Sequence, residues 1–158
     1  MGYIEEIRAL VGHRRIILNV AGALIVDELG RVLLQKRTFP AVTWGIPGGM
    51  MELGESTVET AKREIFEETG LTIDHLHLFH VYSGSELYQA ENGDQYYTVS
   101  TLYTTTDYKG TLKIDPSESD TFEFRSSDQL PEKMFPERRR ILTEYFDLTH
   151  SNQKRQTK

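Results

Sequence analysis

The hydrophobic and polar residues of this chain alternate in a way that predicts several strands and a smaller number of helices. Residues 3–11 carry apolar side chains at helical spacing and are expected to form a short helix. Residues 16–26 form an apolar run rich in strand-forming residues, and residues 32–36 resume an extended pattern after a turn at residues 27–30. The two extended segments are therefore expected to pair with each other as a hairpin.

The rest of the chain continues this mixture of extended and helical patterns. Short strands are expected around Trp44 and over residues 121–126, and longer strands over residues 71–82 and 96–105, with polar loops between them. Pro136 begins a last helix with its apolar residues on one face. Strands before and after a central helix, with helices near both ends, indicate an α/β protein built as a mixed-sheet sandwich.

The C-terminal residues set the expected limit of the folded part. Residues 151–158 are polar and are expected to form a disordered tail. A single domain is therefore expected over residues 1–150.

The central helix is predicted by signals at both of its ends. Ser56, followed three residues later by Glu59, forms a capping box. Gly70 is suited to end the helix in the left-handed conformation. We therefore expect a helix over residues 57–69.

This helix has an apolar stripe beside an acidic one. The apolar positions follow the spacing i, i+3, i+7 and are Val58, Ala61 and Ile65. The acidic positions follow the spacing i, i+3, i+4 and are Glu64, Glu67 and Glu68. Because like charges on adjacent turns repel, a hard divalent cation with oxygen ligands is the natural partner for them. A helix face that is simply solvated is the alternative from these residues alone.

Residues around the glutamates extend this pattern. From Gly49 to Leu71 the chain matches G-x5-E-x7-R-E-U-x-E-E-x-G-U, where U is a bulky aliphatic residue. A chance match in a chain of this length is expected on the order of a few times in a hundred million. In this box the chain resembles the Nudix hydrolase family (MutT-like), with no departures from the family pattern. W-G-I-P-G-G at residues 44–49 and F-E-F at residues 122–124 extend the resemblance to about residues 15–147.

The resemblance implies an α/β/α sandwich around a mixed β-sheet. It also implies hydrolysis of a diphosphate linkage in a substrate that contains a nucleoside diphosphate. The candidate substrates are nucleoside triphosphates, including oxidised ones, dinucleoside polyphosphates and nucleotide sugars. Capped RNA is disfavoured because the chain has no basic stripe. A catalytically inactive Nudix-fold module that senses nucleotides is the alternative, which the complete set of carboxylates disfavours.

The resemblance also assigns a metal site. Glu64, Glu67 and Glu68 would ligate Mg²⁺, with Mn²⁺ as the alternative ion. A backbone carbonyl at Gly48 or Gly49 would add another oxygen ligand. Hard divalent cations prefer such oxygen ligands, and they neutralise phosphate oxygens and activate water.

Other residues are candidates for direct roles in catalysis. Besides Glu64 and Glu68, Arg63 would orient the carboxylates and pair with Glu55. Glu118, in the loop before the strand at residues 121–126, is a candidate general base because the helix glutamates would be occupied by metal. Glu91, in the other long loop, is the competing candidate, and a solvated loop residue is the alternative for Glu118.

Three residues are candidates for substrate binding. Arg37 and Trp44 flank the loop that enters the box, and Tyr88 lies in a later loop. A surface charge, a core aromatic residue and a packing tyrosine are the respective alternatives. No proline occurs between Pro47 and Pro116, which counts against a standard ADP-ribose pyrophosphatase.

The composition narrows the expected partners and location. The chain has 158 residues and no cysteine, which excludes disulfides, thiolate metal ligands and a cysteine nucleophile. Its start lacks the pattern of a signal peptide, and no stretch is apolar over the length of a bilayer, so we expect a cytoplasmic protein without membrane contact. The formal net charge of −6 disfavours general nucleic-acid binding. The expected partner is a small nucleotide substrate, and a homodimer is left open.

Overall fold

Strands form the centre of the computed structural model, which describes residues 2–38, 41–84 and 86–156. The elements, in chain order, are α1 (Tyr3–Val11), β1 (Ile16–Ile25), β2 (Val32–Arg37), β3 (Thr43–Gly45), β4 (Gly48–Met50), α2 (Thr57–Thr69), β5 (Thr72–Asp74), β6 (His77–Ser83), β7 (Tyr88–Gln89), β8 (Gln95–Thr105), β9 (Asp107–Lys109), β10 (Ser119–Arg125), a 3₁₀ turn η1 (Ser127–Gln129) and α3 (Pro136–Gln156).

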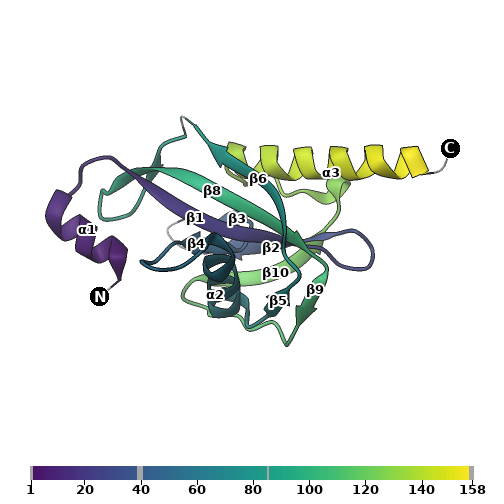
Figure 1. The fold of residues 1–158 in the computed structure, drawn as a ribbon, viewed down its shortest axis with the longest axis horizontal. Helices are drawn as coiled ribbons and strands as arrows, with labels where there is room; N and C mark the ends of the chain where they lie inside the picture. The colour runs from purple at the N-terminus through teal and green to yellow at the C-terminus, as the bar shows by residue number, and fades with distance from the viewer. Residues whose placement is uncertain (1, 39–40, 85, 157–158) are drawn as a thin grey trace.

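The strands form two main sheets and one small one (Figure 1). The largest sheet has the order β4-β1-β8-β6, with β7 also paired to β8. Its central pair, β1 and β8, is parallel, whereas β4, β6 and β7 pair antiparallel with their neighbours. The second sheet has the order β10-β2-β3, and β5 pairs with β9. This mixture of parallel and antiparallel strands confirms the mixed sheet expected from the sequence.

The helices α2 and α3 pack on opposite faces of the strands. In β1, Ala23 and Ile25 belong to a buried cluster that includes Ile65 of α2. Leu24, between them, belongs to a second buried cluster, the α3-side core, which includes Ile141 of α3. Side chains alternate between the two faces of a strand, so β1 is covered on both sides. Figure 1 accordingly shows α3 along one side of the sheets and α2 on the other. The predicted α/β/α sandwich is confirmed.

The expected hairpin between residues 16–26 and 32–36 is wrong. Beyond the turn, only Val26 and Val32 form a bridge, and β1 and β2 then join different sheets. Residues 21–26 and 32–35 are all buried. A two-stranded hairpin cannot cover both faces of two such strands, so each strand takes other neighbours and becomes part of a larger layer.

The single strand expected over residues 71–82 is two strands, β5 and β6, which belong to different sheets. The break is at His75, the one non-glycine residue in the described part of the chain with a positive φ, at +50°. The loops expected on either side of residues 96–105 contain β7 and β9, both of which are short.

The polar C-terminal segment is helical and not a disordered tail as far as residue 156. Residues 151–156 continue α3 although they are exposed, and residues 157–158 lie outside the described residues. No glycine or proline interrupts this segment, and glutamine, lysine and arginine have high helix propensities. Within the described ranges, no helix is both long enough and apolar enough to cross a membrane.

Candidate active site

Local sequence signals position α2 beneath the glycine-rich strand β4. The Ser56 hydroxyl accepts a hydrogen bond from the Glu59 backbone (3.2 Å), and the Ser56 backbone donates to the Glu59 carboxylate (2.7 Å). Gly70 ends the helix with φ at +76°, as expected for a left-handed cap. Ala61 and Ile65 are fully buried against the strands. This packing turns the acidic stripe of α2 toward β4.

The acidic stripe lines an open cleft of about 510 Å³, which we call the acidic cleft. Its acidic residues are Glu64, Glu67 and Glu68 of α2, together with Asp115 and Glu118 from the loop before β10. The three glutamates therefore converge on one space, as their helical spacing predicted. Glu118 reaches the same space from a distant part of the chain, whereas Glu91 does not line this cleft.

Arg63 holds the carboxylates around it in place. Its guanidinium donates to both oxygens of Glu55, at 2.5 and 2.9 Å, as the resemblance implied. It also donates to Glu64 (2.7 Å) and to Glu67 (3.2 Å), and to the backbone carbonyl of Met50 (2.9 Å). Charge-assisted hydrogen bonds of this kind fix geometry as well as charge. Arg63 thus links α2 to the end of β4.

The surroundings of Glu68 in the acidic cleft disfavour its negative charge. Burial raises its pKa to about 7, and the negative charges of Glu64 and Glu118 act in the same direction. The backbone N–H of Gly48, which donates to Glu68 at 3.0 Å, and the charge of Arg37 only partly oppose this shift in pKa. Burial also raises the pKa of Glu64. Such carboxylates are well suited to take up an additional positive charge.

These residues fit a hard divalent cation by their chemistry. All the side chains that could ligate the ion are carboxylates. Gly49 has no side chain, which leaves room for the Glu64 carboxylate to lie directly against the backbone of β4. Among the described residues, no three acidic or histidine side chains already surround one point at the spacing of metal ligands. In this conformation Glu64 and Glu67 face Arg63.

An aromatic pocket of about 670 Å³ adjoins the acidic cleft. Among its lining residues are Trp44, Tyr88, Tyr96 and Phe135. Tyr88 and Tyr96 are stacked with ring centroids 5.7 Å apart. Such a pocket matches the size and the mainly apolar, aromatic lining of small-molecule sites.

The three residues predicted to bind substrate all line this aromatic pocket. Arg37 and Tyr88 also line the acidic cleft, whereas Trp44 lines only the pocket. Trp44 is at the same time part of the α3-side core, and the guanidinium of Arg125 lies 5.2 Å from its ring centroid. Trp44 is therefore both a core residue and a residue that lines the aromatic pocket. Glu91 lines the pocket as well.

Sequence reasoning missed Arg138, which lines both the cleft and the pocket. Arg138 lies three and four residues before the buried Ile141 and Leu142, so it falls on the apolar face of α3. A charged residue on the buried face of a predicted helix is the signal that could have found it.

The comparison with known families agrees with this geometry. The sequence profile of the NUDIX domain matches residues 17–145. This range is most of the chain, so the chain belongs to the Nudix family. The crystal structure of the MutT NUDIX hydrolase from Burkholderia pseudomallei superposes with a TM-score of 0.69 at 27% sequence identity, covering 81% of this chain and 97% of that one.

Curated relatives match a shorter part of the chain. The oxidized purine nucleoside triphosphate hydrolase of Danio rerio is 46% identical over 56 residues, which are 34% of this chain and 36% of that protein. The putative 8-oxo-dGTP diphosphatase of Bacillus subtilis (strain 168) is 44% identical over 50 residues, or 32% and 33% of the two chains. The chain thus spans about a third of the length of these curated relatives.

The ion pair between Glu55 and Arg63 gives a pH-dependent prediction for stability. Hydrogen bonds from Arg63 lower the pKa of Glu55 from 4.5 to about 2. Between these two pKa values the folded state therefore binds fewer protons than the unfolded state. The stabilisation that the ion pair gives the fold is complete above pH 4.5 and is lost as the pH falls toward 2. We expect Glu55→Gln to lower the free energy of unfolding at pH 7 by about 1–3 kcal/mol.

Urea unfolding of both proteins between pH 3 and 7 measures this difference. The matched control is Glu123→Gln, because Glu123 also pairs with an arginine (Arg125, 2.5 Å) but is 43% exposed, where ion pairs contribute little. If the difference in free energy of unfolding between Glu55→Gln and the parent does not shrink toward low pH, the ion pair with Arg63 is not the cause of the stabilisation.

Two adjacent glycines of β4 are expected to respond differently to substitution. The three atoms nearest to a Cβ on Gly49 would be those of the Glu64 carboxylate, at 2.3–2.8 Å, and not backbone atoms. A Cβ on Gly48 would lie 2.6 Å from the backbone of Ala21 and Gly22, at a φ of +152°. We expect Gly49→Ala to keep the melting temperature but to lower kcat by about 100-fold, because the Glu64 carboxylate is displaced. Gly48→Ala is expected to lower the stability by about 1–3 kcal/mol.

Circular dichroism melting and steady-state kinetics on the two variants test this contrast. Wild-type kcat in Gly49→Ala would show that the position of Glu64 against β4 is unimportant for turnover.

Proposed function

We propose that this protein is a divalent-cation-dependent hydrolase that cleaves a diphosphate linkage in a nucleoside diphosphate-linked substrate. The observation that carries the proposal is the convergence of three helix glutamates on a cleft that opens into an aromatic pocket. Mg²⁺ is the proposed ion and Mn²⁺ the alternative, with Glu64, Glu67, Glu68 and a carbonyl of Gly48 or Gly49 as the proposed ligands.

A divalent cation held in such a site would neutralise the phosphate oxygens and make the attacking water more acidic. The protein's own residues supply position and proton transfer. Arg63 holds the carboxylates of the acidic cleft in a fixed arrangement. Glu118 faces the same cleft without lying on α2, so its carboxylate is proposed to accept the proton of the attacking water.

The reaction balances as a hydrolysis. Water oxygen bonds to one phosphorus, and the bridging oxygen leaves with the other phosphoryl group. The products are a nucleoside monophosphate, or a shortened nucleotide, and the phosphorylated remainder. Trp44 and Tyr88 are proposed to contact the base, and Arg37 is proposed to contact phosphate.

Purine nucleoside triphosphates, including oxidised ones, are the first substrates to test. This choice is supported by the similarity to proteins named oxidized purine nucleoside triphosphate hydrolase and putative 8-oxo-dGTP diphosphatase. The aromatic walls of the adjoining pocket suit a planar base. Dinucleoside polyphosphates and nucleotide sugars belong in the same screen.

The decisive experiment is a screen of these nucleotides with Mg²⁺, with Mn²⁺ and with a chelator, in which product masses are measured. We expect turnover only with a divalent cation. Undiminished turnover after exhaustive chelation, in protein shown to contain no metal, would overturn the metal-dependent mechanism. Tight nucleotide binding without any turnover would favour the alternative of a nucleotide-sensing module.

A further inference from the structure

Two arginines lie where the acidic cleft opens into the aromatic pocket. The residues that line both cavities are Arg37, Gly48, Tyr88, Tyr96 and Arg138. A ligand that occupies both cavities would therefore lie beside both arginines. Arg37 comes from β2 and Arg138 from the first turn of α3, so the fold brings them together from distant parts of the chain.

Neither arginine uses its donors fully within the described part of the chain. The Nε of Arg37 is buried and has no hydrogen-bond partner there. The nearest acidic oxygen to Arg138 among those residues is that of Glu137, at 3.9 Å, which is beyond hydrogen-bond distance. The Arg138 side chain is nevertheless only 22% exposed. An unpartnered buried Nε is unfavourable for Arg37, and Arg138 has no carboxylate within hydrogen-bond distance in the described ranges, so an anionic ligand is a fitting partner for both.

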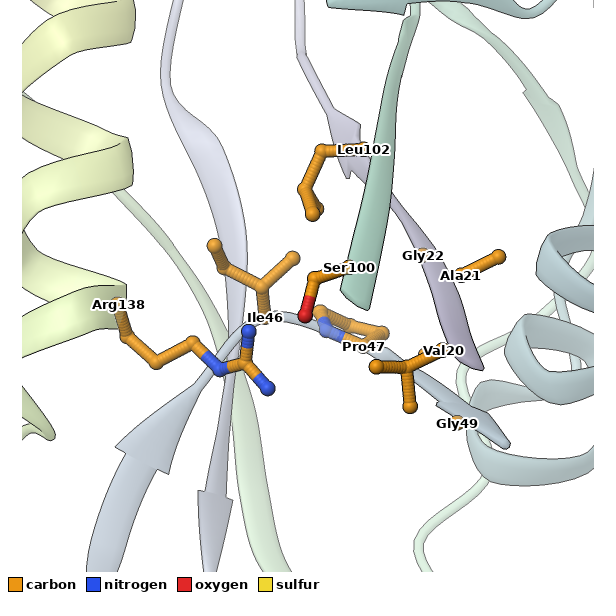
Figure 2. A pocket seen from close by; sticks show the side chains of 10 residues that line it. Val20, Ala21, Gly22, Ile46, Pro47, Gly49, Ser100, Leu102 and Arg138 are labelled. Carbon is orange, nitrogen blue, oxygen red and sulfur yellow. The ribbon is translucent and has the colours of Figure 1, made fainter. Parts of the chain in front are cut away.

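The surroundings of Arg138 direct it toward the cavities. Figure 2 shows the Arg138 side chain extending from α3 toward Ile46 and Pro47, at a further, small cavity that Ser100 also lines. The neighbouring carboxylate of Glu137 is engaged elsewhere, because it accepts a hydrogen bond from the Tyr88 hydroxyl.

The charge pattern indicates which chemical group the arginines bind. The three glutamates of α2 line the acidic cleft and not the aromatic pocket, whereas Trp44 and Phe135 line the pocket and not the cleft. The positive charges of Arg37 and Arg138 both act on the hydroxyl of Tyr96, where they oppose the rise in pKa that burial causes. Guanidinium groups match phosphate oxygens with two parallel hydrogen bonds. A phosphate group is therefore the ligand that these two arginines fit.

We propose that Arg138, together with Arg37, binds the phosphate group nearest the nucleoside and so places the base in the aromatic pocket and the remaining phosphates in the acidic cleft. This inference rests on the proposed function, because it assumes a nucleotide as the ligand. It assigns Arg138 as a positioning residue that sets the direction in which the substrate lies.

Binding without turnover tests the proposal. The affinities of AMP and GMP, and of adenosine and guanosine, are measured by calorimetry in the presence of a chelator. We expect the wild-type protein to bind at least one monophosphate about 10- to 100-fold more tightly than its nucleoside. In Arg138→Gln this ratio should fall toward one while the nucleoside affinity stays the same. Arg138→Lys should keep part of the ratio, because lysine retains the charge without the planar fork.

Arg140→Gln is the matched control. Arg140 lies two residues further along α3, pairs with Glu144 (3.0 Å), is 64% exposed and lines neither cavity. This variant should keep the wild-type ratio, and melting temperatures of all variants establish that they are folded.

Three outcomes would overturn the proposal. In the first, the wild-type protein binds the monophosphates no more tightly than the nucleosides. In the second, Arg138→Gln keeps the wild-type affinities for both the monophosphate and the nucleoside. In the third, it weakens both ligands equally, which would give Arg138 a structural or base-binding role. Because no hydrolysis is measured, a failure of the proposed hydrolase activity would leave this result unaffected.

Discussion

Replacing Glu68 by glutamine is expected to lower kcat by more than about 100-fold while the protein stays folded. Loss of a residue that merely supports a metal ligand commonly lowers affinity or activity by about 10- to 100-fold, and a direct ligand should matter more. The amide is a poorer ligand than a carboxylate for a hard cation. Its carbonyl oxygen can still accept the hydrogen bond from the Gly48 backbone, which the Glu68 carboxylate accepts at 3.0 Å.

The stability of this variant is expected to equal or exceed that of the parent in the presence of a chelator. The neutral side chain removes a buried negative charge that lies near the charges of Glu64 and Glu118. Steady-state kinetics over a range of Mg²⁺ concentrations, together with urea unfolding, measure both effects. Glu6→Gln is a control, because Glu6 is an exposed glutamate of α1 that lines neither cavity. Parent-level turnover of Glu68→Gln at saturating Mg²⁺ would remove Glu68 from the site.

The central helix could be predicted almost completely from the sequence because its signals are local. Ser56, Glu59 and Gly70 lie at its two ends, and Ala61 and Ile65 repeat at helical spacing. Each of these signals acts over a few residues, so no knowledge of the tertiary structure is needed. The convergence of Glu64, Glu67 and Glu68 follows from the same spacing.

The pairing of strands was harder to predict because it depends on distant segments. β1 pairs in parallel with β8, from Ile16 opposite Tyr96 to Ile25 opposite Thr105. A hairpin was the expected arrangement because β1 and β2 are adjacent in sequence. What decides the arrangement is the burial of both strands on both faces, and this depends on the helices and strands that cover them.

The substrate side of the site was only partly predictable for the same reason. Arg37 and Trp44 were candidates because they flank the loop that enters the box, and Tyr88 because it lies in a later loop. All three line one pocket. Arg138 joins them only because α3 packs across the sheets. No spacing within the sequence relates residue 138 to residue 37, so their meeting is a property of the topology.

Mutation can also test which residue acts as the general base, the group proposed to take a proton from the attacking water. Glu118 lies in the turn that begins at Asp115, where the backbone N–H of Glu118 donates to the Asp115 carbonyl (3.0 Å). The backbone of Thr38 also donates to the carbonyl of Glu118 (3.2 Å). These contacts hold the loop beside the acidic cleft and leave the carboxylate of Glu118 exposed on its surface. An exposed carboxylate that does not lie on α2, where the metal ligands are proposed, would be free to accept a proton from water.

Glu118→Gln is therefore expected to lower kcat by about 10²–10⁴-fold, the range for loss of a general base. KM should change much less, because the group acts on water and not on the nucleotide. Glu91→Gln is the competing variant, since Glu91 lines the aromatic pocket and not the acidic cleft. If Glu118→Gln turns over at the parent rate while Glu91→Gln is strongly impaired in kcat, the proton is taken by Glu91, and the loop at residues 115–118 has no part in the chemistry.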